Sequence, residues 1–374
     1  MNRRKKRISF IILCAYLISL LSIPAEAAPG ISAQSAAVID VESGRILYQK
    51  QGYEKMRVAS LTKIMTAIVA IEEGRLSDMV AVPDQAIGTE GSSIYLRHGE
   101  KLTLEHLLYG LMLRSGNDAA VSIAHHIGGS LEGFARLMNE KAEYLGLTQT
   151  HFTNPHGLDD SNNHYSTAVD MAKISAYALQ NEDFKRIVST KVINIPQHGE
   201  KWDRKLINKN KMLHLYEGAD GVKTGYTKLA KRCLVSSATR DGRQLAVVTL
   251  NAPSDWSDHA RLLDYGFKQF ERVELVGLKE NVDASKGLYS INAFYYPLAS
   301  GERQNVRRQI VMEEGYKELL PGGVAGYLHI YLRDQQIGRI GLVYEGDKST
   351  LGPGGKESGW SFLSIFKSLI WGGL

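Results

Sequence analysis

Residues 221–250 read GVKTGYTKLAKRCLVSSATRDGRQLAVVTL, and this stretch decides the fold class. Three segments rich in β-branched and apolar residues, 221–227, 233–238 and 245–250, are separated by short polar turns at 228–232 and 241–243. Such alternation of apolar runs and turn residues predicts a meander of antiparallel strands. The chain therefore contains a sheet in this region.

On the N-terminal side of this meander, a strand pattern comes first and a series of helix patterns follows it. Near the N-terminus, segments 36–41 and 45–48 flank Glu42-Ser43-Gly44 and predict a hairpin. Apolar residues at helical spacing predict helices at 60–73, 104–114, 118–127, 131–145 and 167–179. Strands at both ends with helices between them indicate an α/β layered domain, in which the terminal segments share one antiparallel sheet. Pattern alone leaves the strand pairing open.

The pattern changes after residue 267. Residues from about 271 to 349 alternate between apolar and polar, which predicts a small all-β domain. We therefore divide the 374 residues into a large domain at 28–267, a small β-rich domain at 268–350, and a linker with a tail at 351–374.

The first 27 residues have the composition of a secretory signal peptide. Five basic residues lie in the first seven positions, an apolar run covers 8–23, and Ala25-Glu26-Ala27 supplies a small-residue cleavage site. This order predicts export, with an uncleaved membrane anchor as the alternative. Without these residues the chain has 40 basic and 39 acidic side chains, a balance that argues against nucleic-acid binding.

The number of cysteines shows whether a disulfide can stabilise the fold. Cys14 lies in the predicted signal, so Cys233 is the single cysteine of the remaining chain and no intrachain disulfide can form there. We interpret Cys233 as a packed strand residue. Its alternative is a reactive thiol close to a binding site.

Three short motifs combine the residue types of nucleophilic catalysis: Ser60-x-x-Lys63, Ser115-Gly116-Asn117 and Lys223-Thr224-Gly225. A serine hydroxyl is inert near neutral pH unless a base removes its proton, and a lysine can act as that base when burial and a second cation lower its pKa. At the start of a helix, Ser60 and Lys63 project from one face, and backbone N–H groups can stabilise an oxyanion. Each motif alone is a weak signal of catalysis. The order of the three motifs and their predicted structural setting support the hypothesis of a serine nucleophile.

Together these motifs resemble the penicillin-recognising serine enzymes. Within that group, the chain is similar to the low-molecular-mass D-alanyl-D-alanine carboxypeptidases, a likeness supported by 59–66, 154–158, 166–172 and 220–225. The resemblance covers about residues 32–267, and the β-rich segment with its tail also matches. It implies a β-lactamase-like α/β domain, with an antiparallel sheet and a helical cluster, followed by a small all-β domain.

The resemblance also implies the catalytic roles. Ser60 is expected to be the nucleophile that forms an acyl-enzyme, and Lys63 its general base. Ser115 is expected to relay a proton to the departing D-alanine, and Asn117 to hold the peptide amide.

For substrate binding, the resemblance implies that Lys223 and Thr224 hold the terminal carboxylate. Gly225 lets the substrate backbone approach the strand, and the N–H groups of Ser60 and Tyr226 form the oxyanion hole. No metal or cofactor is expected. The histidines at 125, 126, 151, 156 and 164 do not form a zinc motif, and we expect structural hydrogen bonds from His156 and His164.

The expected substrates are peptidoglycan stem peptides ending in D-Ala-D-Ala, and β-lactams are the expected covalent inhibitors. Ser-Gly-Asn in place of Ser-Asp-Asn favours the carboxypeptidases over class A β-lactamases. No glutamate stands out as an activator of the deacylating water, so we expect slow turnover of penicillin. Alternatives are an endopeptidase that cuts cross-links, a catalytically silent β-lactam or muropeptide sensor, and a structural wall-binding protein.

The last segment of interest is the tail at 360–371. It carries a serine stripe, and apolar residues cover the rest, with Trp360 and Trp371 at its ends. Such a helix is too short to span a bilayer but suits its interface, which predicts peripheral membrane contact on the outer face of the cytoplasmic membrane. Docking onto a protein surface is the alternative.

Overall fold

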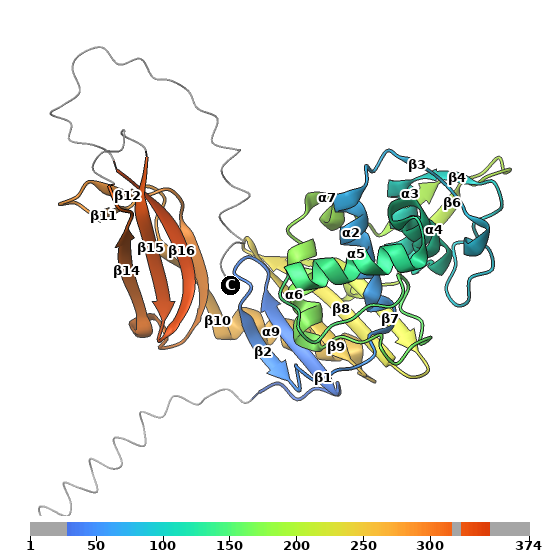
Figure 1. Cartoon of the computed structure of the whole chain (residues 1–374). Coiled ribbons are helices and arrows are strands. Elements are labelled where there is room, and N and C mark those ends of the chain that lie inside the picture. The colour runs from blue at the N-terminus through green and yellow to red at the C-terminus, as the bar shows by residue number, and fades with distance from the viewer. Residues whose placement is uncertain (1–27, 316–322, 345–374) are drawn as a thin grey trace, which may run out of the picture. The chain divides into compact units, whose positions relative to one another are not determined.

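A computed structural model describes residues 28–315 and 323–344 (Figure 1). The predicted signal at 1–27 and the predicted tail at 360–371 lie outside the described residues. Two compact units are present, one ending at Lys268 and the other beginning at Gln269. Within the described ranges, no helix is both long and apolar enough to cross a bilayer.

The first unit combines a five-stranded antiparallel sheet with a helical cluster (Figure 1). Its main strands are β1 (Ser35–Asp40), β2 (Ile46–Lys50), β7 (Ala219–Thr227), β8 (Lys231–Arg240) and β9 (Arg243–Leu250). Its helices are α2 (Lys63–Glu73), α3 (Leu104–Arg114), α4 (Asn117–Gly128), α5 (Leu131–Tyr144), α6 (Ala168–Ala178), α7 (Glu182–Ser189), α8 (Met212–Leu215) and α9 (Asp255–Gln269). Two short hairpins, β3 (Met79–Ala81) with β4 (Lys101–Thr103) and β5 (Val192–Ile195) with β6 (Arg204–Ile207), complete it.

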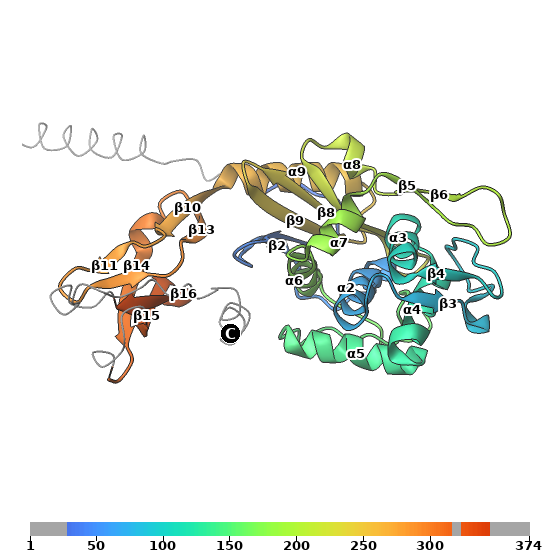
Figure 2. The same cartoon turned by 90° about the horizontal axis from the view of Figure 1, so that it is seen from above.

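Strand order in the sheet is β2-β1-β9-β8-β7. The pairing of β1 with β9, from Ser35 opposite Leu250 to Asp40 opposite Leu245, joins the two ends of the unit. Every residue of β1 is buried, which requires cover on both faces of the sheet. Figure 2 shows that α9 lies on one face, while α2, α5 and α6 lie on the other.

Helix α2 runs through the middle of the helical cluster. Its first eight residues, Lys63–Ala70, are all buried, and Gly74 ends it. A helix that is buried on all sides must be apolar on all sides, and Lys63 is the one charged residue in those eight positions. The central helix therefore carries a lysine into the protein interior at its first residue.

The second unit is all β. It contains β10 (Phe270–Val276) paired with β13 (Phe294–Ala299), and a sheet ordered β11-β12-β16-β15-β14. These strands span β11 (Asn281–Asp283), β12 (Leu288–Ser290), β14 (Val306–Met312), β15 (Val324–Leu332) and β16 (Gln335–Tyr344). Apolar residues from both sheets, including Leu275, Leu298, Leu328 and Leu342, form its core.

The mixed α/β class with antiparallel sheets and a C-terminal β unit is confirmed. Two local predictions need correction. The helix expected from Ser60 begins as a 3₁₀ turn, η1 (Ala59–Thr62), and becomes α-helical at Lys63. The turn expected at 228–232 is shorter, because Lys231 already starts β8.

Candidate active site

All three sequence motifs meet at the start of α2. The Lys63 Nζ atom lies 3.1 Å from Ser60 Oγ, 2.7 Å from Asn117 Oδ1 and 2.6 Å from the His156 carbonyl oxygen. Lys223 on β7 acts on the pKa of Lys63 as a neighbouring positive charge. The side chains of Lys63 and Lys223 are both fully enclosed, with 0% and 1% of their surface exposed. Residues separated by more than 150 positions in the sequence thus form one cluster.

The contacts of Lys63 suit a proton acceptor. An ammonium donates three hydrogen bonds, whereas a neutral amine donates two and keeps a lone pair. Asn117 Oδ1 and the His156 carbonyl accept the two shorter bonds. In the neutral form, the lone pair of Lys63 therefore faces Ser60 Oγ, where it can receive the hydroxyl proton.

Burial and like charges favour the neutral form of this lysine. Desolvation lowers the pKa of Lys63 well below its usual value, and the positive charges of Lys223 and Lys209 lower it further. Burial also lowers the pKa of Lys223 to about 7, with a smaller effect of Lys209 in the same direction. Neither Lys63 nor Lys223 forms an ion pair with a carboxylate of the described residues. The cluster therefore favours a free base beside Ser60.

Glycine allows the close packing around Ser60. A Cβ atom added to Gly225 would lie 3.3 Å from the Ser60 backbone nitrogen, so β7 passes tightly along the 3₁₀ turn. A Cβ atom on Gly157 would lie 1.9 Å from the Ala59 carbonyl oxygen, and Gly157 has a φ of +82°. Larger residues at either position would push the neighbouring chain away from Ser60.

A histidine network holds the backbone just before Ser60. The Thr153 N–H donates to His164 Nδ1 at 3.1 Å, so the ring proton lies on Nε2, which is 2.8 Å from Thr62 Oγ1. Thr62 Oγ1 in turn donates to the Ala59 carbonyl at 2.9 Å. Burial lowers the pKa of His164 to about 4, which keeps the ring neutral as this network requires.

The Ser115-Gly116-Asn117 turn links α3 to α4. Ser115 ends α3 in the left-handed region, with φ 65° and ψ 32°. Asn117 Nδ2 donates to the Glu90 carbonyl at 2.5 Å, and its Oδ1 accepts from Lys63, so both ends of the amide are engaged. Among the described residues, none forms a hydrogen bond with the Ser115 hydroxyl. Ser115 therefore keeps a donor and an acceptor for a substrate.

The next residue, Asp118, was not singled out by the sequence. Its buried carboxylate accepts hydrogen bonds from the backbone N–H groups of Ile94 and Leu96 and from Ser93 Oγ. It thereby holds the loop beside the turn. A short polar residue after Asn117 at a helix start is the signal that would have identified it.

Along β7, the residues become more exposed from Lys223 to Tyr226. Lys223 is buried, Thr224 and Gly225 are half-buried, and Tyr226 is 65% exposed. Lys223 Nζ donates to the Thr224 carbonyl at 2.7 Å. Thr224, Gly225 and Tyr226 are therefore accessible to a ligand, whereas Lys223 acts from beneath them.

Lys209 is a further cation that the sequence reading missed. It precedes α8, donates from Nζ to Ser92 Oγ at 3.2 Å and lowers the pKa of both Lys63 and Lys223. The His156 carbonyl was also missed, because the acceptor is a backbone atom. Asn154 Oδ1 fixes that segment by accepting from the N–H groups of His156 and Gly157 at 3.2 and 2.7 Å.

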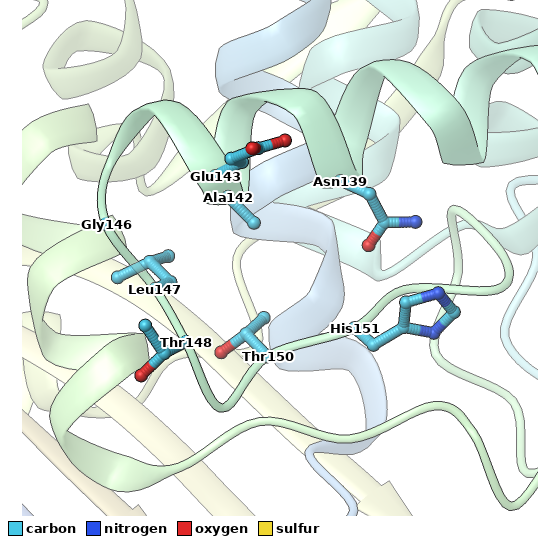
Figure 3. Close-up of a pocket in the computed structure, with 8 residues that line it drawn as sticks. All are labelled: Asn139, Ala142, Glu143, Gly146, Leu147, Thr148, Thr150 and His151. Atoms are coloured by element: carbon cyan, nitrogen blue, oxygen red, sulfur yellow. The ribbon is translucent and has the colours of Figure 1, made fainter.

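Other candidate groups lie apart from this chemistry. The described residues hold no group of three His, Cys, Asp or Glu side chains that could bind a metal. Cys233 is buried, and burial raises the pKa of its thiol to about 12, so the structure favours the packed interpretation. A pocket of about 310 Å³ lies between the end of α5 and residues 146–151 (Figure 3). No candidate catalytic residue lines it, and Asn139 and Thr150 in its wall are hydrogen-bonded within the protein.

Comparison with known proteins identifies the family. Residues 23–254 match the profile of peptidase family S11, D-alanyl-D-alanine carboxypeptidase. The chain belongs to this family. It is thus a serine-type hydrolase of the penicillin-binding class, as the motifs predicted.

Several relatives extend the match. D-alanyl-D-alanine carboxypeptidase DacF of Bacillus subtilis is 38% identical over 260 residues, which cover 67% of this chain and 66% of that protein. DacA of Haemophilus influenzae is 29% identical over 388 residues and 96% of each chain. The crystal structure of penicillin binding protein 5 from Haemophilus influenzae has a TM-score of 0.70 and 28% identity, and the match covers 86% of this chain and 98% of that one. Both units of this family member therefore have counterparts in a solved relative.

Proposed function

We propose that this carboxypeptidase removes the terminal D-alanine from peptidoglycan stem pentapeptides through an acyl-enzyme on Ser60. The observation that carries the proposal is the placement of Lys63 Nζ, buried and without a carboxylate partner among the described residues, 3.1 Å from Ser60 Oγ. A base held there removes the serine proton as the oxygen attacks the carbonyl carbon of the penultimate D-alanine.

The reaction proceeds in two stages. Ser60 Oγ forms a bond to the carbonyl carbon while its proton moves to Lys63, and the N–H groups of Ser60 and Tyr226 receive the oxyanion. The carbon–nitrogen bond then breaks, and the proton passes through Ser115 to the amine of the departing D-alanine. Water adds to the acyl-enzyme by the same route and releases the shortened peptide.

The remaining residues bind and orient the substrate. Thr224, with the cation of Lys223 beneath it, receives the terminal carboxylate, and Gly225 gives the peptide room along β7. Asn117 first positions Lys63. Its Nδ2 carries two hydrogens, and one of them is bonded to the Glu90 carbonyl. The second hydrogen is available to the peptide carbonyl of a bound substrate. β-Lactams acylate Ser60 in the same position and are released slowly.

The enzyme acts outside the cytoplasm in this proposal. The signal-like composition of residues 1–27 supports export, and the amphipathic composition of 360–371 supports attachment to the outer face of the cytoplasmic membrane. Deletion of 357–374 should release the protein from membranes. Unchanged membrane retention of that variant would contradict the attachment.

The first test is the release of D-alanine from diacetyl-L-Lys-D-Ala-D-Ala by residues 28–374, with Ser60→Ala as the matched control. We expect release by the parent protein and none by the variant. If folded protein releases no D-alanine yet is labelled at Ser60 by a fluorescent penicillin, it is a sensor, or an endopeptidase that needs cross-linked substrates. If it shows neither signal, the proposed function is wrong.

A further inference from the structure

The second unit carries an unusual outward face on β14, β15 and β16. Cross-strand partners share a face of a sheet. Arg307 lies opposite Tyr331, Gln309 opposite His329, Val311 opposite Tyr327, and His329 also lies opposite Arg339. We name these seven residues the cationic–aromatic face: Arg307, Gln309, Val311, Tyr327, His329, Tyr331 and Arg339.

This face has no role in the core of the unit. The alternate residues of β15, Leu328 and Ile330, point the other way and are 1% and 0% exposed. Tyr327, His329 and Tyr331 are half-buried, and they form a row about 13 Å long at the usual strand rise. Three consecutive outward positions of a central strand are thus aromatic, where small polar residues would serve solubility equally well.

Both arginines of the face are held in place by the tyrosines. The Arg339 guanidinium carbon lies 3.5 Å from the centre of the Tyr327 ring, and that of Arg307 lies 4.4 Å from the centre of the Tyr331 ring. A guanidinium stacked on a ring keeps its N–H donors in its own plane, where they can bind a planar anion.

These arginines also have no anionic partner. Among the described residues, neither Arg307 nor Arg339 forms an ion pair, whereas the adjacent Arg308 pairs with Glu280 at 2.7 Å. None of the seven residues of the face is acidic. The hydroxyls of Tyr327 and Tyr331 likewise form no hydrogen bond with any residue in the described ranges. Charge and hydrogen-bonding capacity are therefore available to an anionic, hydroxyl-rich partner.

We propose that the cationic–aromatic face binds peptidoglycan itself, with Arg307 and Arg339 holding stem-peptide carboxylates and the row on β15 contacting the glycan. The choice of this polymer rests on the proposed function, since the polymer that the catalytic unit cuts carries these carboxylates. Arginine forks match carboxylates through two parallel hydrogen bonds. A lipid surface fits less well, because electrostatic membrane binding takes clusters of about four to eight basic residues and interfacial insertion takes a broad apolar face.

Binding of the polymer at a second site would raise the local concentration of its stem peptides near the catalytic unit. Once the face is occupied, stem peptides on the same strand reach the catalytic unit at an effective concentration set by the tether rather than by diffusion. The face is thus expected to matter for polymeric substrate and to have no effect on a soluble tripeptide.

The test compares sedimentation of the full chain with purified insoluble sacculi, stripped of covalently attached phosphate polymers, for three proteins. Arg307→Gln with Arg339→Gln should weaken binding about tenfold relative to the parent, because two charge-assisted contacts are lost. The matched control is Arg303→Gln with Arg333→Gln, which removes the same charge from exposed positions of the same unit outside the face. This control should bind as the parent does.

A single substitution provides a second test. Gln309 already accepts from Arg307 Nη1 at 3.3 Å, so Gln309→Glu places a carboxylate among the cations of the face without removing any of them. It should weaken sedimentation as the double variant does. Chemical amidation of the carboxyl groups of the sacculi should abolish the difference between the parent and these variants.

Several outcomes would overturn the proposal. They are equal sedimentation of the parent and both face variants, a difference between the parent and these variants that survives amidation, or binding to vesicles of phosphatidylglycerol without binding to sacculi. Release of D-alanine from the soluble tripeptide is measured on every protein and should stay unchanged in the face variants. Absence of that release in the parent would instead refute the proposed function. Failure of the binding proposal and failure of the proposed function are therefore distinguishable.

Discussion

Two pairs of cations in this molecule occupy opposite environments. Lys63 and Lys223 of the first unit are enclosed, and burial lowers the pKa of both. Arg307 and Arg339 of the second unit are exposed and stacked on tyrosine rings. All four lack an ion-pair partner among the described residues.

The difference shows how environment selects the use of a positive charge. A lysine whose charge is made unfavourable by burial becomes a base, because it releases its proton near neutral pH. An arginine retains its charge under any ordinary condition and serves as a permanent anion receptor. The four predictions below test this contrast from its largest expected effect to its smallest.

Replacing Lys63, the proposed base, should have the largest effect. Lys63→Met fills a similar volume, removes the proposed proton acceptor and is expected to lower kcat/KM for D-alanine release about 10²- to 10⁴-fold. The measurement is steady-state kinetics on the soluble tripeptide, with circular dichroism as the check on folding. A folded variant that retains more than a tenth of the activity would show that another group takes the proton from Ser60.

Acid should destabilise the first unit through its buried imidazoles. Burial lowers the pKa of His156 and His259 to about 3 and that of His164 to about 4, all below the value of about 6.5 in an unfolded chain. Between about pH 4 and 6.5 the unfolded chain therefore binds more protons than the folded one, and stability falls as the pH falls. The expected slope is about 1.4 kcal/mol per pH unit for each histidine.

Urea unfolding at pH 7, 6 and 5 measures this slope. His259 bonds Ser236 Oγ and Thr249 Oγ1 away from the Ser60 cluster, so His259→Asn should flatten the slope without altering the pH dependence of catalysis. A stability that is independent of pH across this range would show that the imidazoles are not held neutral.

Removing the second buried cation should shift the pH dependence of catalysis. Without the positive charge of Lys223, the pKa of Lys63 rises, so the acidic limb of the kcat/KM profile should move about one unit to higher pH. Lys223→Met is the variant, compared with the parent between pH 5 and 9. Weaker substrate binding with an unmoved acidic limb would limit Lys223 to holding the carboxylate.

Substituting the exposed cations should have the smallest effect on the fold. Arg307→Gln with Arg339→Gln is expected to change the free energy of unfolding by no more than about 0.5 kcal/mol for each position, because surface positions contribute little. Thermal unfolding is the measurement. A loss of several kcal/mol would mean that the arginines stabilise the sheet rather than remain available to a ligand.

Much of this protein was determined by local sequence. The strands at 221–227, 233–238 and 245–250, the helices that begin near Leu104 and Leu131, and the change to all-β structure after 267 follow from periodicity and turn residues. The candidate catalytic pair could be identified because Ser60 and Lys63 are three residues apart on one helical turn, and such proximity does not depend on how the rest of the chain is arranged.

Long-range contacts decided the remainder. The pairing of β1 with β9, the Asn117 amide and His156 carbonyl on Lys63, and the influence of Lys209 join residues that are far apart in the chain. A backbone carbonyl has no signature in the sequence, and the pKa of a lysine depends on burial, which only packing creates. The sequence motifs identified the candidate reactive residues. The tertiary structure set the pKa values of their lysines, because desolvation occurs only in the folded interior.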